Sequence, residues 1–539
     1  MSTRDILTNI LCLTVTEERG ILRTSIPRER LAEVIDELVN CRGLLAQTEA
    51  TQLEASIAAL NGSGLALSSM YATDDRSTNH TFGVHAVLHD DTARVWLVVS
   101  TQLPENDPTF PSVTRLVMAA HWYERYISDM FGITPVGHPD LRRLVHHENV
   151  PEQHFPLRKD FVWNAKMEKA NIPYPMHTVE GEGVYEIPVG PIHAGIIEPG
   201  HFRFNVAGER IITLEGKLFF THKGVEKLLE DKTVEQAQPF VDRVSGDAAV
   251  SHALAFAQAV EAIAGVEISQ RAAGLRSLAN ELERATMHIH DLANIIGNGT
   301  GYTVGAAQGM RIKERLVRLS TEIFGNRFWR GFVVPGGVSK DINANELQRI
   351  AEVATKAIDE MLRLMKILLR SDGLRDRLET TGILSVEAAR AYGAVGVPAR
   401  ASGIDRDMRR DHPHAGYNRF VPAVIKKNGG DVYARVLQRI DELQESRRLI
   451  AEICKGPGEG RYKVDCAAKN GLGIGVTEGW RGETLHVVIM KDGKIDRHVV
   501  RDPSFCNWAL FGELAPGNIV PDFPLCNKSL NLSYSGTDL

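Results

Sequence analysis

The chain has 539 residues, 43% of them hydrophobic and 24% charged, which is enough apolar material for several packed cores. Lys and Arg total 62 against 68 Asp and Glu, so the basic excess typical of nucleic-acid-binding proteins is absent and nucleic acid is not an expected partner. No apolar run approaches the about 18 to 20 residues that cross a bilayer, and the first residues lack an export signal. We expect a cytoplasmic chain whose membrane attachment comes through partner subunits.

The six cysteines are scattered, and none forms a C-x-x-C pair: Cys12, Cys41, Cys454, Cys466, Cys506 and Cys526. Zinc and iron–sulfur sites draw closely spaced thiolates, so we predict neither in this chain. A nucleotide-binding loop is not indicated either, because the glycines of 456–460 are not followed by a helix pattern or by Lys-Ser/Thr.

Residues 1–162 read as a small α+β domain. The runs Thr81–Leu88 and Ala93–Thr101 predict a β-hairpin that turns at His89-Asp90-Asp91. The basic, proline-punctuated segment 137–160 is typical of an extended surface tail, and residues 163–186 are the predicted linker.

Residues 187–539 read as a second, mainly α-helical domain with peripheral β-hairpins. A hairpin is predicted from Phe202–Val206 and Arg210–Phe220, and another from Thr484–Met490 and Lys494–Val500 around Asp492-Gly493. Helical periodicity predicts four helices, over Ser251–Ala264, Gln270–Ile296, Asn345–Leu369 and Tyr433–Cys454. The expected fold class of the whole chain is therefore α+β.

Motifs in the first domain carry a family resemblance. Tyr126–Ile133, Gly137–Arg143 and Pro156–Asp160 resemble the signature of the smaller peripheral-arm subunit of respiratory complex I. The resemblance implies that the basic tail, with Arg142, Arg143, Arg158 and Lys159, contacts partner subunits.

The second domain resembles the large catalytic subunit shared by complex I and the energy-converting (group 4) [NiFe] hydrogenases. The matching motifs are Gly190–His193, Glu198–Phe204, Thr221–Lys227, Asn280–Arg284, Gly403–Asp407 and Trp480–Glu483. The fused arrangement is similar to formate hydrogenlyase large subunits and to fused C/D subunits of complex I. It implies an iron–sulfur small subunit holding a [4Fe–4S] cluster, membrane antiporter-like and anchor subunits, and a formate dehydrogenase or NADH-oxidising module as partners.

The hydrogenases of this family hold nickel and iron with four thiolates, because soft sulfur suits these metals. The corresponding positions here are Ser245, Ala248, Ser504 and Asn507, while Cys506 stands one position away. A hydroxyl, a methyl and an amide do not replace a thiolate, so we expect no nickel, no other metal, no cofactor bound by this chain and no hydrogen turnover.

The same loss is found in complex I relatives, and this favours a quinone as acceptor. Quinone reduction needs hydrogen-bond and proton donors at both carbonyls. His201 matches the family's headgroup histidine, and Glu198 matches the acid that passes protons near the metal in hydrogenase relatives. Gly246 stands where the family places its quinone tyrosine. Structural roles at strand ends remain the alternative for His201 and Glu198.

Two further residues are candidates for the inherited site. Arg481 resembles an arginine that reaches the hydrogenase active site, and its fork of donors suits an anion or a carbonyl; the alternative is a surface turn. Asp247 introduces a carboxylate between the lost cysteine positions, either as a proton carrier or as a helix N-terminal acid.

Two sets of charged residues outside that site have two interpretations each. Glu281, Arg284 and His288 lie on one helix face. They form either an internal ion pair or part of a proton path. Arg409 and Arg410 belong to a basic run that is either a solvated face or an interface with the iron–sulfur and membrane subunits.

Three functions remain open at this stage. The first is electron transfer to a quinone or another non-hydrogen acceptor, the second a non-catalytic scaffold with a degenerate site, and the third, least favoured, a hydrogen-evolving enzyme.

Overall fold

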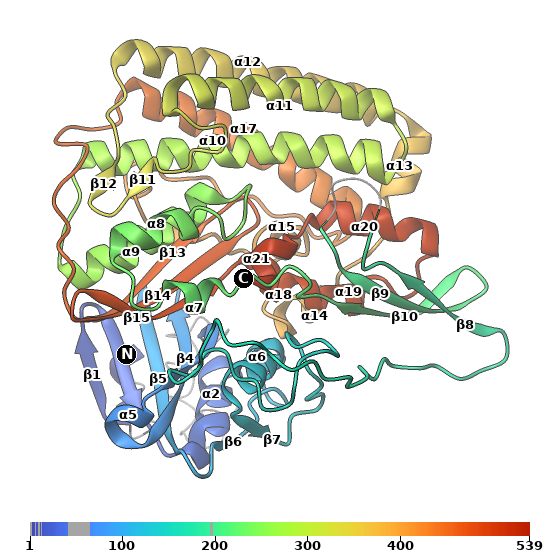
Figure 1. Ribbon diagram of the computed structural model, residues 1–539. Helices are drawn as coiled ribbons and strands as arrows, with labels where there is room; N and C mark the ends of the chain where they lie inside the picture. Colours follow the sequence, from blue (N-terminus) through green and yellow to red (C-terminus); the bar gives the residue numbers. More distant parts are fainter. Residues whose placement is uncertain (1–2, 6, 9–10, 12, 41–64, 194–197) are drawn as a thin grey trace, which may run out of the picture. The chain divides into compact units, whose positions relative to one another are not determined.

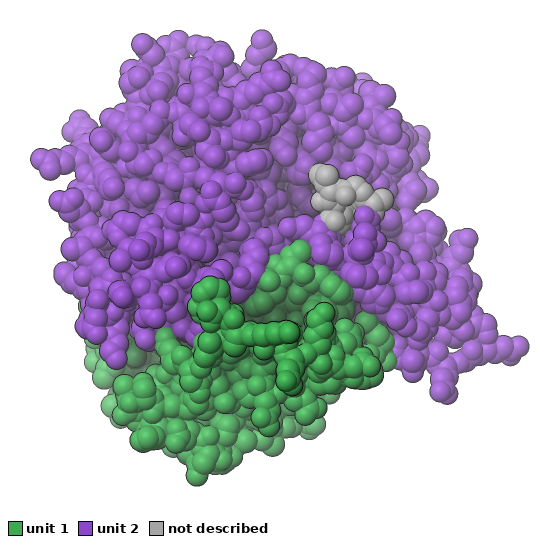
Figure 2. Space-filling view, viewed as in Figure 1, with its two compact units in different colours: residues 1–176, 217–222, 391–393 green, residues 177–216, 223–390, 394–539 purple. Residues whose placement is uncertain are grey.

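The computed structural model describes the chain except for residues 1–2, 6, 9–10, 12, 41–64 and 194–197. The chain divides into two compact units, coloured separately in Figure 2. The first contains residues 1–176, 217–222 and 391–393, and the second contains the rest. Within the described ranges, no helix combines the length and the apolar character that a membrane span requires.

The first unit is built on a mixed five-stranded sheet. Its strand order is β1-β2-β5-β4-β3, and only β2 and β5 run parallel. Helix α6 packs against β3, and α2 packs against β5. The elements are β1 Val15–Glu18, β2 Ile21–Ser25, α2 Leu31–Asn40, β3 Ala66–Asp74, α5 Arg76–Asn79, β4 Thr81–Asp90, β5 Val95–Pro104, β6 Thr109–Pro111, α6 His121–Phe131 and β7 Thr134–Val136.

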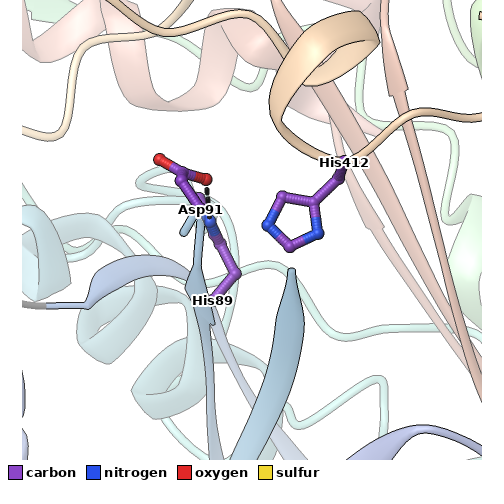
Figure 3. Close-up of side chains that lie close together, drawn as sticks. All are labelled: His89, Asp91 and His412. Carbon is purple, nitrogen blue, oxygen red and sulfur yellow. Dashed lines mark ion pairs between the residues drawn. The ribbon is translucent and has the colours of Figure 1, made fainter. Parts of the chain in front are cut away.

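The predicted hairpin is confirmed as β4 and β5, which pair antiparallel. Its turn differs from the prediction, because His89 belongs to β4 and opposes Trp96. The His89 ring is buried and its Nδ1 lies 2.7 Å from a carboxylate oxygen of Asp91 (Figure 3). A buried, paired imidazole explains why the strand continues through His89 and Asp90.

The segment 137–160 is largely exposed or half-buried, as its polarity predicts, but it is anchored at a few buried points. Leu144, Val145 and Leu157 are buried. One carboxylate oxygen of Asp129 accepts hydrogen bonds from three successive backbone N–H groups, those of residues 144, 145 and 146, at 2.8 to 3.1 Å. The Lys217 ammonium donates to the carbonyls of residues 143, 144 and 146. Backbone groups bonded to buried charges hold this segment in place, which residue polarity alone does not reveal.

The second unit contains a layer of long helices (Figure 1). Helix α10 (Gln270–Asn294) packs against α11 (Thr303–Phe324) and α17 (Val432–Lys455), and α12 (Ala344–Leu368) packs against α11 and α17. The apolar stripes of these helices form one core. A π-helical turn, Ile295–Gly299, follows α10, so the helix ends within two residues of its predicted end.

A second layer pairs one helix with an antiparallel sheet. The sheet has the order β13-β14-β15, from β13 Gly471–Glu478, β14 Glu483–Lys491 and β15 Lys494–Arg501. Helix α9 (Ala249–Ala264), rich in alanine, packs on β13 and β14. Gly473 and Gly475 permit this approach, because a Cβ at either would overlap a backbone carbonyl of α9. The β14–β15 turn has φ of 51° at Asp492 and 76° at Gly493, the geometry that the Asp-Gly pair predicts.

A small sheet of order β10-β9-β8 precedes these layers in the chain. Its first strand, β8, begins at Val184, inside the segment predicted as linker. The remaining elements of the second unit include β8 Val184–Val189, β9 His201–Ala207, β10 Arg210–Lys217, α7 Val225–Leu229, α8 Val234–Val241, β11 Val333–Val334, β12 Gly337–Val338, α13 Asp372–Leu378, α14 Val386–Ala391, α15 Gly396–Ala401, α16 Met408–Asp411, α18 Pro503–Asn507, α19 Phe511–Leu514, α20 Phe523–Leu530 and α21 Tyr534–Asp538. The expected α+β class, with a helical second domain and peripheral hairpins, is confirmed.

Candidate active site

The two segments that replace the cysteine motifs are joined through a third serine. Ser245 precedes α9, and Ser504 lies in α18. The hydroxyl of Ser533 is 2.8 Å from the hydroxyl of Ser245, and the backbone N–H of Ser533 donates to the hydroxyl of Ser504 at 2.9 Å. Ser245 and Ser504 are buried. The structure thus brings the two motifs together, as the resemblance implies.

An ion pair adjoins this serine bridge. The Arg481 guanidinium donates to both carboxylate oxygens of Asp247, at 2.8 and 2.7 Å. The guanidinium lies 3.8 Å from the centre of the Trp480 ring, and the Trp480 indole N–H donates to the Asp247 carbonyl. Ser245 donates to the Asp247 carboxylate at 3.0 Å. We refer to Ser245, Asp247, Arg481, Ser504 and Ser533 as the Asp247 cluster.

Charges around the cluster fix the protonation state of Asp247. Burial alone would raise the pKa of the Asp247 carboxyl. The adjacent Arg481 charge and its hydrogen bonds outweigh burial, so the pKa is lowered to about 2. Burial also lowers the pKa of His290, to about 4, with Lys313 nearby. At neutral pH the cluster therefore contains an ionised carboxylate and a guanidinium beside a neutral imidazole.

The donor set of the cluster does not fit a nickel–iron centre. Ala248 offers a methyl group, and Asn507 uses its side chain to bond the backbone N–H and C=O of Val395, each at 3.1 Å. Ser245 and Ser504 are hydroxyls engaged with Ser533, and Cys506 is only one thiol. Soft metals need several thiolates, and these four positions supply none. The cluster therefore lacks the ligands that a nickel–iron centre needs.

Glu198 is connected to the cluster by the C-terminal segment. Its carboxylate accepts the backbone N–H of Ser535 at 2.9 Å, and the Ser535 hydroxyl donates to the carbonyl of Val244, next to Ser245. The ammonium of Lys223 donates to the Ser535 carbonyl at 2.8 Å. An exposed acid and a lysine therefore lie at the edge of the cluster.

His201 lies apart from the cluster in its bonding. It begins β9, and its Nδ1 is 3.2 Å from the carbonyl oxygen of Gly190. Within the part of the chain that the structure describes, no hydrogen bond joins His201 to Asp247 or Arg481. The structure brings Asp247 and Arg481 together with the serines, reaches Glu198 through Ser535, and leaves His201 outside this network.

The charged face of α10 belongs to a buried ion-pair network. The Arg284 side chain is 3.7 Å from Glu281 and 3.4 Å from Glu442, and His288 is 2.9 Å from Glu442. Arg409 donates to Glu281 at 2.9 Å, and its side chain is only 2% exposed. Arg409 is therefore not part of a solvated face, because buried carboxylates within the second unit, including Asp407, surround it, and its contact with a partner stays a prediction.

The other expected interface residues are mostly bonded within their own unit. Arg142 pairs with Asp140 at 2.7 Å, and Arg143 donates to the carbonyl of Val150. Arg158 donates to the Phe131 carbonyl and stacks on Phe155. The backbone N–H of Lys159 donates to Asp74, and Arg410 pairs with Asp405 and Asp411. These basic residues therefore make hydrogen bonds and ion pairs within the chain. Their contact with a partner stays a prediction.

Sequence reasoning missed three residues of the site. Ser533 and Ser535 lie near the C-terminus, where a Leu-Ser-Tyr-Ser run carries no recognisable signal. Glu283 accepts hydrogen bonds from the backbone N–H groups of Val250 and Ser251 and from the Ser251 hydroxyl, at 2.7 to 3.2 Å. Burial raises the pKa of Glu283 to about 7, with the nearby Asp247 charge contributing. The sequence does contain a signal for such a residue. The N-cap of α9 is Ala248, whose side chain cannot accept a hydrogen bond, so the first N–H groups of the helix need an acceptor from elsewhere.

Comparison with known proteins agrees with this architecture. Residues 46–167 match the family described as respiratory-chain NADH dehydrogenase, 30 Kd subunit, and residues 299–470 match the 49 Kd subunit. One chain of the membrane-bound sulfane sulfur reductase, an archaeal respiratory membrane complex, has a similar fold, with a TM-score of 0.63 and 24% identity over 68% of this chain and 100% of that chain.

The similar curated proteins are fused in the same way. Formate hydrogenlyase subunit 5 of Escherichia coli is 32% identical over 88% of this chain and 84% of its own length, and hydrogenase-4 component G of the same organism is 32% identical over 87% and 83%. The C/D subunit of NADH-quinone oxidoreductase from Phocaeicola vulgatus is 28% identical over 74% and 81%. The chain therefore belongs to the family of formate hydrogenlyase subunit 5 and hydrogenase-4 component G, in which counterparts of the 30 and 49 Kd subunits of NADH dehydrogenase are fused in one polypeptide.

Proposed function

We propose that this chain is a peripheral subunit of a membrane-bound oxidoreductase and passes electrons from an iron–sulfur partner to a quinone or another non-hydrogen acceptor. Its place would be the inner face of the cytoplasmic membrane, between an iron–sulfur subunit with a [4Fe–4S] cluster and membrane antiporter-like and anchor subunits. A formate dehydrogenase or an NADH-oxidising module would supply the electrons. Relatives named as formate hydrogenlyase and NADH-quinone oxidoreductase subunits support this setting.

The observation that carries the proposal is the Arg481–Asp247 pair beside the joined serine segments. A guanidinium held by a carboxylate and by an aromatic ring is a preorganised hydrogen-bond donor for an oxygen that gains negative charge. Reduction of a carbonyl-type acceptor generates such an oxygen. Glu198 and Lys223 at the edge of the cluster are groups that exchange protons with water.

A test uses the intact complex purified through a tagged partner subunit. We expect Arg481→Lys to lower electron flux to a soluble quinone analogue by at least about tenfold, equivalent to about 1.4 kcal/mol of transition-state stabilisation. The matched control is Arg327→Lys, at an exposed arginine paired with Glu314, which should leave flux unchanged. Stoichiometric nickel, or hydrogen evolution from a reduced dye, would contradict the proposal.

A non-catalytic scaffold is the second candidate, and one observation favours it. Three of the five Arg481 N–H donors are already engaged, two with Asp247 and one with the carbonyl of Asn531. A scaffold predicts that Arg481→Lys and Glu198→Gln leave flux unchanged, while disruption of the bonded segment 137–160 prevents assembly. Co-purification of the partner subunits with each variant separates the two functions.

A further inference from the structure

A chain of three buried histidines leads to the Asp247 cluster. His252 of α9 lies 3.0 Å through its Nε2 from Asp502, and 3.0 Å through its Nδ1 from Nε2 of His486 in β14. Nδ1 of His486 lies 2.8 Å from Nε2 of His498 in β15. All three imidazoles and Asp502 are at most 1% exposed. We refer to the three histidines and Asp502 as the histidine relay.

One end of the relay adjoins the candidate site. Asp502 caps α18 by accepting the backbone N–H of Ser504 at 2.8 Å, and Ser504 belongs to the Asp247 cluster. The Arg481 charge also acts on the Asp502 carboxyl. A proton gained or lost at Asp502 therefore changes the charge directly beside the cluster.

At the other end, the relay stops at an unpaired nitrogen. Nδ1 of His498 is buried and has no hydrogen-bond partner among the residues that the structure describes. An unpaired buried nitrogen costs about 1 to 3 kcal/mol, so a chain that served only to hold Asp502 would gain nothing from its last member. A path that exchanges a proton needs such an end. His498 is fully buried, and the outer edge of β15 is hydrogen-bonded to residues 226, 231 and 232, so water reaches this nitrogen only when the packing there opens.

The bonding pattern fixes one tautomer throughout the relay. An ionised Asp502 only accepts, so Nε2 of His252 carries its proton, and its Nδ1 must accept from Nε2–H of His486. His486 in turn accepts from Nε2–H of His498, which leaves a lone pair at Nδ1 of His498. Burial lowers the pKa of His486 and His498, and Arg497 beside His498 adds to this, so these rings are neutral.

We propose that the histidine relay reversibly loads one proton from water onto Asp502, at the edge of the Asp247 cluster. A hydronium protonates Nδ1 of His498, and that ring passes its Nε2 proton to Nδ1 of His486. His486 passes its own Nε2 proton to Nδ1 of His252, and His252 passes its Nε2 proton to Asp502. One proton enters, one N–H bond forms and one breaks at each ring, and Asp502 becomes neutral.

After this transfer every ring is the Nδ1–H tautomer, so the relay cannot carry a second proton inward until the first returns or the buried rings turn over. The relay can therefore balance a negative charge that forms transiently at the Asp247 cluster. It does not support a continuous flow of protons. Arg481 faces the Asp502 end, and Arg497, paired with Glu226, faces the His498 end.

The test reads the tautomers directly in the full chain labelled with ¹⁵N-histidine, with ring signals assigned by single His→Phe variants. At pH 7.5 we expect Nε2–H at His252, His486 and His498. In Asp502→Asn the amide oxygen keeps the Ser504 N–H and the NH₂ group turns to His252, so all three rings should switch to Nδ1–H. Rings at 486 and 498 that keep Nε2–H in this variant would overturn the relay.

Two controls make the result specific. His486→Phe interrupts the chain, so Asp502→Asn added to it should switch His252 and leave His498 unchanged. In the unmodified chain, lowering the pH should convert the three rings together with one apparent pKa, and three independent transitions would also overturn the proposal. Because the readout needs no electron acceptor, it succeeds or fails separately from the proposed function.

Discussion

Asp247 and Arg481, 234 positions apart in the sequence, are joined by two parallel hydrogen bonds of 2.8 and 2.7 Å. The pair ties the loop before α9 to the turn between β13 and β14. Because the Arg481 side chain is only 6% exposed, its charge depends on Asp247 for compensation.

Asp247→Asn should therefore destabilise the chain. Arg481 would remain buried without its counter-charge, and we expect a loss of about 2 kcal/mol in the free energy of unfolding, less than for a fully buried pair because Asp247 is one-third exposed. Urea denaturation checks this value. The control Glu314→Gln removes an exposed ion-pair partner and should cost less than about 1 kcal/mol. Equal losses in the two variants would contradict the role assigned to the pair.

Glu283 should make stability fall with rising pH. Its pKa is raised to about 7 in the folded chain, so the folded state holds a proton that the unfolded state releases near pH 4.5. The stabilisation is complete below pH 4.5 and is lost as the pH rises through 7, by on the order of 3 kcal/mol. Glu283→Gln has no titrating carboxyl at this position and so lacks this pH-dependent stabilisation. The free energy of unfolding of the unmodified chain, relative to that of Glu283→Gln, should therefore fall between pH 5 and 7.5.

The same pH series has an internal control. Glu314 has its pKa lowered to about 2 by hydrogen bonds from Arg327 and Arg318, so the difference between Glu314→Gln and the unmodified chain should stay constant from pH 5 to 7.5. A constant difference for Glu283→Gln over this range would show that its carboxyl is ionised throughout.

Gly475→Ala should disturb the packing of α9 on β13. The added Cβ would overlap the Ala255 carbonyl, and backbone cannot yield as a side-chain tip does. We expect a loss of at least about 2 kcal/mol, measured by thermal or urea unfolding. Gly512→Ala is the matched control, since no atom lies within 4 Å of its added Cβ, and its stability should be unchanged or slightly raised. Similar behaviour of the two variants would exclude a close helix–sheet approach.

Asp129→Ala should loosen the segment that its carboxylate holds. Three buried N–H groups lose their acceptor, for a cost of about 3 kcal/mol. Trypsin should then cleave after Arg142 and Arg143 faster than in the unmodified chain, as peptide mass analysis would record. Glu168→Ala, at an exposed residue, should cleave at the original rate. Unchanged protection in Asp129→Ala would assign the ordering to Lys217 alone.

Local patterns predicted the fold where the signal itself was local. The Asp492-Gly493 turn and the amphipathic stripes of α12 and α17 specify their own geometry, and these elements begin and end within two residues of the predicted positions. The anchoring of the segment 137–160 was not foreseen because it depends on tertiary hydrogen bonds, to Asp129 at 15 to 17 positions and to Lys217 at 71 to 74 positions along the chain. Arg409 was misjudged for the same reason, since Glu281 lies 128 positions away.

The candidate site was predicted in part. The substituted ligand positions, with Asp247 and Arg481, follow from motif resemblance, and the structure joins most of them. Ser533 was not foreseeable as a site residue, because it acts through a backbone N–H group and a hydroxyl whose positions depend on tertiary packing. The histidine relay draws on three elements, so no spacing in the sequence reveals it.

The serine bridge through Ser533 has an evolutionary consequence. Reversion of positions 245, 248, 504 and 507 to cysteine would place thiols beside an arginine–aspartate pair and a hydroxyl that already satisfy one another. A metal would have to displace the hydrogen bonds of Ser533 and Asp247 before those thiols could close around it. Asp247 and Ser533 thus make the effect of cysteines at these four positions depend on neighbouring residues, so nickel chemistry would require more than the restoration of sulfur.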